Sequence, residues 1–309
     1  MKIEHFLKKN ESIYILSLKL FSIYKLFKVN MFKRFSDQMR RKYIKVRYKK
    51  FTGLDLDWNN LARYTEKLQW YKLYSSTEEM KICADKYTVR KWVADKIGEE
   101  YLIPLLGVWD KPDEIPFERL PRQYVLKTSC GSGTNIIVKD NCLLNRKVIM
   151  KRISCWLNAD YAYLNGFEMQ YAACENKVIA EQYMDSPDGD LPDYKFLCFG
   201  GKPYYCWVDI GRYHEHKRNI YDLEWNLQKW NQSDYGNSQK PIKKPKNFEK
   251  MVEIVGILCK DFSHVRVDLY NIDGKILFGE MTFTNGSGFE LIIPDEYNKK
   301  IGDLWNLKM

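Results

Sequence analysis

The sequence predicts an α+β fold with mostly antiparallel sheets, together with a smaller helical or mixed N-terminal region and a basic N-terminal helix. Two observations predict it. Helical patterns concentrate in residues 51–120, whereas strand patterns dominate residues 121–283. In addition, residues 265–270 and 277–282 alternate apolar and polar side chains around Asp273-Gly274. This pattern indicates two antiparallel strands joined by a tight loop.

The chain length and composition allow a sizeable core. With 309 residues the chain can form two domains, or one large domain with an appendage. Hydrophobic residues make up 45% and aromatic residues 15%, which excludes a disordered chain. The eight cysteines form no C-x-x-C pair and follow no cleavable signal peptide, so we expect reduced thiols. We expect an appendage (1–50), a helical or mixed domain (51–120) and a main domain (121–309) with lobes 121–185 and 186–309.

The net charge of +10 is concentrated at one end of the chain. Residues 1–50 contain 15 Lys and Arg against 3 Asp and Glu, so the remaining residues carry a net charge of −2. A nucleic-acid-binding protein of this size would spread basic surface over its folded domain. We therefore expect no nucleic-acid partner, and a local electrostatic role for the appendage.

The basic appendage contains an apolar stretch at residues 13–29. Lysines at positions 19, 25 and 28 interrupt it, which disfavours a transmembrane span, and it lacks the small-residue cleavage site of a signal peptide. Apolar residues recur at helical spacing with lysines between them, as in a helix lying on an anionic membrane surface. A basic helix packed on its own protein explains the pattern equally well, and both interpretations remain open.

Each element of the remaining chain has a local signature. Residues 65–70 open a helix with an aromatic inward face, and residues 85–93 begin another with Asp85 as its N-cap. A loop rich in proline and acidic residues follows at 111–121. We then expect a strand (124–127), a glycine loop, a strand (136–138), a helical stretch (near 145–175), three strands (178–184, 194–199, 203–209), a polar loop (226–248) and a helix (249–259) before the hairpin.

The glycine loop has the composition of a phosphate-binding turn. Gly131-Ser132-Gly133 lies between two expected strands. Glycine allows close approach and positive φ, so backbone N–H groups can close over a phosphate. Lys127 in the preceding strand can place its ammonium group against the α and β phosphates. An ordinary hairpin turn is the alternative, because the segment matches neither a P-loop nor a dinucleotide fingerprint.

Two further segments carry polar groups on strands. The strand ending at Glu181-Gln182-Tyr183-Met184 offers backbone groups to an adenine edge and a carboxylate to ribose hydroxyls; a strand that simply leaves the core is the alternative. Asp193 and Lys195 lie two residues apart, hence on one face. With apolar neighbours, the lysine needs either a route by which its ammonium group reaches water or an anionic partner, which can be a phosphate or a structural salt bridge.

The hairpin brings two carboxylates together. If its loop holds three residues, Asp268 faces Glu280 and Arg266 faces Thr282, with opposed Cβ atoms only about 4.5–5.5 Å apart. Two carboxylates this close require a cation between them, and the arginine suggests that this cation has an anionic ligand. The arrangement fits magnesium on a polyphosphate. A cross-strand salt-bridge network is the alternative.

The order of these segments resembles the ATP-grasp superfamily. The motifs resemble those of the TupA-like ATP-grasp family of polysaccharide and teichuronopeptide gene clusters over about residues 50–295. The motifs that carry the resemblance are Thr65-Glu66-Lys67-Leu68-Gln69-Trp70, Asp85-Lys86-Tyr87, Lys127 with the glycine loop, Asp193-Tyr194-Lys195-Phe196, Arg266-Val267-Asp268 and Phe278-Gly279-Glu280-Met281-Thr282-Phe283.

The resemblance implies two α+β lobes that grip ATP, and it implies roles for particular residues. Arg266 and Lys195 would be catalytic, and Asp268 and Glu280 would bind Mg²⁺, with Mn²⁺ as a substitute. Many superfamily members have Glu-x-Asn where this chain has Glu280-Met281-Thr282, so either Thr282 or Asn285 would complete the metal site. The residues that would bind ATP are Lys127, Gly131, Ser132, Gly133, Glu181, Tyr183, Asp185 and Lys195.

The activity implied by the resemblance is ATP- and Mg²⁺-dependent ligation of a carboxylate to an amine through an acyl phosphate, in bacterial capsular or cell-wall polysaccharide biosynthesis. The substrates would be a small-molecule or lipid-linked saccharide and an amino acid or amine. The protein would be cytoplasmic, or peripheral on the inner face of the plasma membrane through residues 1–50. A glycosyltransferase using Asp55-x-Asp57 or Asp188-x-Asp190, a phosphotransferase on the same fold, and a non-enzymatic scaffold are the alternatives.

Overall fold

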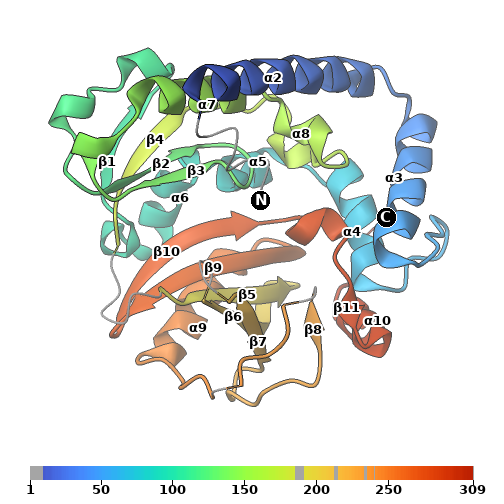
Figure 1. The fold of residues 1–309 in the computed structure, drawn as a ribbon. Coiled ribbons are helices and arrows are strands. Elements are labelled where there is room, and N and C mark those ends of the chain that lie inside the picture. The colour runs from blue at the N-terminus through green and yellow to red at the C-terminus, as the bar shows by residue number, and fades with distance from the viewer. Residues whose placement is uncertain (1–9, 185–190, 212–214, 233–234, 240, 309) are drawn as a thin grey trace. The chain divides into compact units, whose positions relative to one another are not determined.

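The computed structural model describes residues 10–184, 191–211, 215–232, 235–239 and 241–308 (Figure 1). The chain forms two compact units, each assembled from separate segments. Unit 1 contains residues 1–40, 85–87 and 104–183, and unit 2 contains residues 41–84, 88–103 and 184–309. The chain therefore passes from one unit to the other directly after Tyr183. Asp185, expected to bind ribose, lies outside the described residues.

Unit 1 contains a four-stranded antiparallel sheet in the order β1-β4-β2-β3. Its strands are β1 (Leu105–Trp109), β2 (Tyr124–Thr128), β3 (Asn135–Val138) and β4 (Val178–Gln182). The expected helical stretch near 145–175 is shorter than predicted and broken into α7 (Arg146–Leu157), α8 (Tyr161–Leu164) and the 3₁₀ turn η5 (Met169–Tyr171). Three further 3₁₀ turns are η2 (Pro112–Glu114), η3 (Phe117–Arg119) and η4 (Asn141–Leu143).

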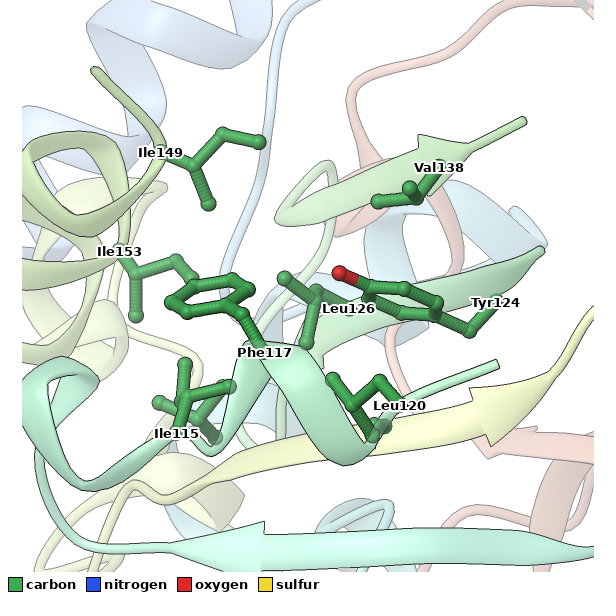
Figure 2. Packing of buried hydrophobic residues seen from close by; sticks show 10 residues of the cluster. Ile115, Phe117, Leu120, Tyr124, Leu126, Val138, Ile149 and Ile153 are labelled. Carbon is green, nitrogen blue, oxygen red and sulfur yellow. The ribbon is translucent and has the colours of Figure 1, made fainter. Parts of the chain in front are cut away.

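One face of this sheet forms the core of unit 1 (Figure 2). Tyr124 and Leu126 of β2 point into it and are fully buried, as strand alternation requires. The cluster contains Ile115, Phe117, Leu120, Tyr124, Leu126, Val138, Ile149, Ile153, Val178 and Ala180. The alternate residues Val125 and Lys127 therefore lie on the opposite face, where the paired strand β4 contributes Ile179 and Glu181.

The basic N-terminal segment forms the long helix α2 (Glu11–Lys33), with Asn10 as its N-cap. The helix contacts α7 and α8 and buries Tyr14, Val29 and Phe32 (Figure 1). Phe32 packs edge-on against Phe167 with ring centroids 5.6 Å apart. The segment is thus a helix packed on its own protein, although only one of its faces is used. Among the described residues, no helix combines the length and apolar character needed to cross a membrane.

Unit 2 contains a five-stranded antiparallel sheet in the order β10-β9-β5-β6-β7. The strands are β5 (Asp193–Phe199), β6 (Lys202–Ile210), β7 (Lys217–Tyr221), β9 (His264–Ile272) and β10 (Lys275–Thr282). Helix α9 (Phe248–Cys259) buries an apolar stripe and contacts β5, β6 and β9. All seven residues of β5 are buried, which makes its Asp193 and Lys195 unusual for a central strand.

Helix α4 (Tyr64–Tyr74) of unit 2 supports the loop that follows the hairpin. Gln69 Nε2 donates to the carbonyl of Gly288 (2.6 Å) and Lys72 Nζ to that of Ser287 (2.8 Å). Both acceptors belong to the turn η6 (Asn285–Gly288). The other elements are α3 (Asp37–Thr52), which starts in unit 1, and α5 (Glu78–Ala84), α6 (Thr88–Ile97), η1 (Glu99–Tyr101), β8 (Asn231–Gln232), β11 (Ile292–Ile293) and α10 (Asp295–Asp303).

Candidate active site

The β9–β10 hairpin places Asp268 directly opposite Glu280, and Arg266 opposite Thr282, as the sequence predicts. The expected three-residue loop is wrong, however. Ile272 pairs with Lys275, so the turn holds only Asp273 and Gly274, both with positive φ. A β-bulge between Phe278 and Glu280 then shifts the register by one residue and restores the predicted pairing.

Gly279 is the extra residue of this bulge. A Cβ built on it would lie 3.0 Å from the backbone oxygen of Asp268 and 3.3 Å from Tyr270 Cε2. A larger residue here would therefore need its neighbours to shift by a few tenths of an ångström, so glycine fits the close backbone approach best. The bulge determines which way Glu280 points, so Gly279 is a structural part of the site.

A buried ion cluster connects three adjacent strands of the sheet, the edge strand β10 and the inner strands β9 and β5. Lys195 lies opposite Asp268 on the paired strand, and its Nζ is 2.7 Å from Asp268 Oδ2 and 2.5 Å from Asp193 Oδ2. Arg266 Nε is 2.7 Å from Asp268 Oδ1. None of the residues Asp193, Lys195, Arg266 and Asp268 exposes more than 8% of its surface. Asp268 thus accepts hydrogen bonds from two buried cations.

Arg266 also contacts the other residues expected at the metal site. Its Nη2 donates to Glu280 Oε1 and to Thr282 Oγ1, each at 3.0 Å, and its Nη1 donates to Asn285 Oδ1. Thr282 and Asn285, between which the sequence does not decide, therefore both belong to the cluster. Gln232 Oε1 accepts from Asn285 Nδ2 at 2.8 Å and fixes the orientation of that amide.

The electrostatics of the cluster follow from burial and ion pairing. Burial lowers the pKa of Lys195, but Asp193 and Asp268 more than compensate and raise it, so the lysine stays charged. Burial likewise opposes the charge of Arg266, whose pKa is raised by Asp268 and Glu280. For Asp268, burial is the largest effect and raises the pKa, although Arg266 and Lys195 oppose that shift. Across these residues the three carboxylates outnumber the two cations, which leaves a net negative charge.

Sequence reasoning missed an ion pair on the neighbouring strands. Arg218 of β7 contacts Asp209 of β6 through two hydrogen bonds of 2.6 and 2.9 Å. Asp209 lies opposite Asp193, and it helps raise the pKa of Lys195. Despite burial, the pKa of Asp209 is lowered to about 2, mainly by Arg218. A charged residue at a buried strand position is the sequence signal that could have identified this pair.

The second group of predicted site residues lies in unit 1. Lys127 Nζ is 2.6 Å from Glu181 Oε2. The structure thus brings together Lys127, which is expected to contact the phosphates of ATP, and Glu181, which is expected to lie near its adenine. The loop after β2 closes through Thr128 and Thr134, whose hydroxyls are 2.6 Å apart. Gly131 and Gly133 have φ of 90° and 72°. No hydrogen bond of the described residues uses the backbone N–H of Gly131, Ser132 or Gly133.

The Asp85-Lys86 motif holds this glycine loop, a role that sequence reasoning missed. Asp85 Oδ2 accepts a hydrogen bond from Ser129 Oγ (2.8 Å), and Lys86 N donates to the backbone oxygen of Ser129 (2.8 Å). Lys86 Nζ also contacts the carbonyl of Gly131. Helix α6 begins only at Thr88, so the prediction of Asp85 as the N-cap of a helix over 85–93 is wrong.

Two of the cysteines beside the loop are paired. Cys130 and Cys174 form a disulfide, and both sulfurs lie 3.1 Å from Asp85 Oδ2. The expectation of reduced thiols is therefore wrong for this pair, because residues 44 positions apart meet at the loop. The other six cysteines are free.

Tyr183 is half-buried at the end of β4 and lines a cavity of about 700 Å³ in unit 1. Leu106, Arg122 and Lys139 also line this cavity. It therefore offers both apolar and cationic groups beside the residue expected to frame adenine.

Comparison with known proteins identifies the family. The family described as TupA-like ATPgrasp matches residues 66–306. The chain belongs to the TupA-like ATP-grasp family. The expected fold class is thereby confirmed, including its antiparallel sheets.

Solved structures resemble this ATP-grasp protein only distantly. D-alanine–D-alanine ligase from Bacillus anthracis is 16% identical, with a TM-score of 0.43 over 72% of this chain and 66% of that chain. D-cycloserine synthetase DcsG is 14% identical, with a TM-score of 0.38 over 72% of this chain and 71% of that chain. An L-amino acid ligase from Bacillus licheniformis is 13% identical, with a TM-score of 0.39 over 67% of this chain and 42% of that chain. The chain thus spans slightly less than two thirds of the length of the D-alanine–D-alanine ligase. No curated protein matches the chain.

The cluster of this ATP-grasp protein has the donors that a magnesium ion requires. Asp268, Glu280 and Asn285 supply carboxylate and amide oxygens, the hard ligands that Mg²⁺ prefers. All three contact one guanidinium group, so their oxygens already converge on a single cationic centre. Together with the excess of carboxylates over cations, this donor set fits the metal.

Proposed function

We propose that the protein is an ATP- and Mg²⁺-dependent carboxylate–amine ligase that acts through an acyl-phosphate intermediate. One observation carries the proposal: in a TupA-like ATP-grasp chain, Arg266 contacts Asp268, Glu280 and Asn285 in a buried cluster. A structural salt bridge needs one carboxylate for this arginine, whereas three oxygen ligands around one cation suit a site that holds metal and phosphate.

Unit 1 would bind the nucleotide. Lys127 would turn from Glu181 to the phosphates, and the backbone N–H groups of Gly131, Ser132 and Gly133 would cover them. Glu181 and Tyr183 would frame adenine. The unused N–H groups of the loop support this assignment, because they leave backbone donors for a phosphate beside two glycines with positive φ.

Unit 2 would bind the metal and stabilise the transferring phosphoryl group. Asp268, Glu280 and Asn285 would hold Mg²⁺, and Mn²⁺ would substitute for it. When bound, the metal would neutralise charge on the phosphate oxygens. The pKa values of Lys195 and Arg266 are both raised by neighbouring carboxylates, so both cations would stabilise the oxygens of the γ-phosphoryl as it moves to the carboxylate. An amine would then attack the acyl phosphate and release inorganic phosphate.

The wider role that we propose is bacterial surface polysaccharide biosynthesis, of the capsule or cell wall. The substrates would be a saccharide, small or lipid-linked, and an amino acid or amine. Family membership supports this role only by analogy. A lipid-linked acceptor would place the protein in the cytoplasm at the inner face of the plasma membrane, as a peripheral protein.

Nucleotide turnover tests the proposal. We would incubate the protein with Mg·ATP and mixtures of uronic acids and amines, and measure ADP release with and without each partner. Hydroxylamine added with the carboxylate alone should trap the acyl phosphate as a hydroxamate. ADP release that needs both partners supports a ligase, and phosphate transfer to an alcohol would indicate a phosphotransferase. Binding of a UDP-sugar without any response to ATP would refute the ligase and indicate a glycosyltransferase.

A further inference from the structure

Helix α2 is apolar on two opposite faces. One face packs on α7 and α8 and buries Tyr14, Val29 and Phe32. The outward face, which we call the outer stripe, consists of seven residues whose exposed fractions lie between 39% and 69%: Ile13, Leu16, Leu20, Ile23, Tyr24, Phe27 and Met31. The helix thus presents large apolar side chains on the side that its own unit does not cover.

The outer stripe is continuous. Residues 13, 16, 20, 23, 27 and 31 follow one another at steps of three or four, so they lie in one row along the helix. At 1.5 Å per residue the row is about 27 Å long. Half of the exposed large hydrophobic residues in the described chain lie on α2. Exposed apolar side chains are therefore concentrated on this helix and not spread evenly over the surface. A contiguous patch of this kind marks an interaction surface.

The charges around the outer stripe identify the chemistry of the partner. At 100° per residue, Lys19 lies along one edge of the stripe and Lys28 along the other, and Glu11 is the only acidic residue of α2. Helix α2 itself carries four lysines, at positions 19, 25, 28 and 33, against this single carboxylate. The partner must therefore offer an apolar interior beneath an anionic surface. Two copies of the helix packed face to face would instead bring like charges together.

We infer that the outer stripe lies in the surface of an anionic lipid bilayer, with α2 parallel to the membrane plane. The apolar row enters the boundary between headgroups and acyl chains, and the flanking lysines meet the headgroups. Because the opposite face is packed on unit 1, the helix carries that unit to the membrane without leaving it. This inference does not depend on the ligase reaction.

Vesicle binding of the full chain tests the inference. We would measure co-sedimentation with phosphatidylcholine vesicles, with and without phosphatidylglycerol. The variant L20S/I23S/F27S should bind the anionic vesicles on the order of a hundredfold more weakly, because three exposed apolar side chains are lost. The matched control L143S/L227S/I293S removes three exposed apolar residues outside α2 and should bind like the wild type.

Two further measurements complete the test. K19Q/K28Q should lose roughly thirtyfold in binding to anionic vesicles, but nothing with neutral vesicles. Circular dichroism and size-exclusion chromatography with light scattering report folding and oligomeric state. Wild-type protein that stays in the supernatant, or an L20S/I23S/F27S variant that binds normally, overturns the inference. A wild-type dimer that this variant converts to a monomer without any vesicle binding assigns the stripe to a second copy instead.

Discussion

Two substitutions in the hairpin, Glu280→Gln and Asp268→Asn, should affect metal binding alike but stability very differently. The Glu280 side chain is 39% exposed and forms a 3.0 Å ion pair with Arg266. Surface pairs contribute about 0–1 kcal/mol, so Glu280→Gln should lower the free energy of unfolding by less than about 1 kcal/mol. Asp268 is only 2% exposed and accepts three hydrogen bonds of 2.7 Å from Lys195 and Arg266. Removing one partner of a buried pair costs about 3–5 kcal/mol.

Thermal melting and nucleotide turnover separate the two effects. At roughly 2–4 °C per kcal/mol, Asp268→Asn should lower the melting temperature by about 6–20 °C, and Glu280→Gln by less than about 4 °C. Both variants should lose more than about a hundredfold in Mg²⁺-dependent ATP turnover. Removing a residue that only hydrogen-bonds to a metal ligand already lowers metal affinity or activity by about 10–100-fold, and the ligand itself should matter more. Equal melting temperatures would refute the burial argument. Normal Mg²⁺ dependence in Glu280→Gln would refute its role as a metal ligand.

Three other predictions concern single side chains. Burial lowers the pKa of His264 to about 3, so the unfolded chain binds a proton below pH 6.5 that the folded chain does not. Stability should fall by up to about 1.4 kcal/mol per pH unit from pH 6.5 towards 3, and His264→Gln should flatten this slope in urea titrations at several pH values. Gly279→Ala should cost about 1–3 kcal/mol and weaken Mg²⁺ binding, because its Cβ would crowd the backbone at the bulge. Gly256→Ala is the control, because nothing lies within 4 Å of a Cβ built at this helical position. It should raise the free energy of unfolding by about 0.5–1 kcal/mol. Equal melting temperatures of the two variants would contradict both predictions. Asp85→Ala should raise the KM for ATP more than it lowers kcat, because it frees the glycine loop; an unchanged KM in steady-state assays would exclude that positioning role.

The β9–β10 hairpin shows which structural features can be predicted from the sequence and which cannot. Strand alternation identifies which side chains share a face, and it correctly predicts that Asp268 faces Glu280. A three-residue loop, however, produces the same pairing as a two-residue turn followed by a one-residue bulge at Gly279. Alternation cannot distinguish these solutions, because both place the same residues opposite each other. Only the backbone reveals the bulge that orients the carboxylate.

Other features depend on contacts between distant segments. The role of Asp85 could not be predicted, because its partners Ser129 and Cys174 lie 44 and 89 residues further along the chain. Likewise, both faces of α2 are apolar, so the sequence predicts a helix but not which face is packed. Charged side chains in strands, such as Lys195 and Arg266, were recognisable because buried charge is rare and demands a partner.

The guanidinium group of Arg266 has a consequence for the folding of the proposed metal site. It contacts Asp268, Glu280 and Asn285, so the protein supplies its own counter-ion for the carboxylates that would otherwise repel one another. Sites without such a counter-ion often fold only around their metal, as zinc fingers do. Here the ligands can be assembled during synthesis of the chain, before any divalent ion arrives. If the protein has the proposed activity, a chelator should therefore stop turnover without unfolding the protein, and circular dichroism with and without chelator would check this.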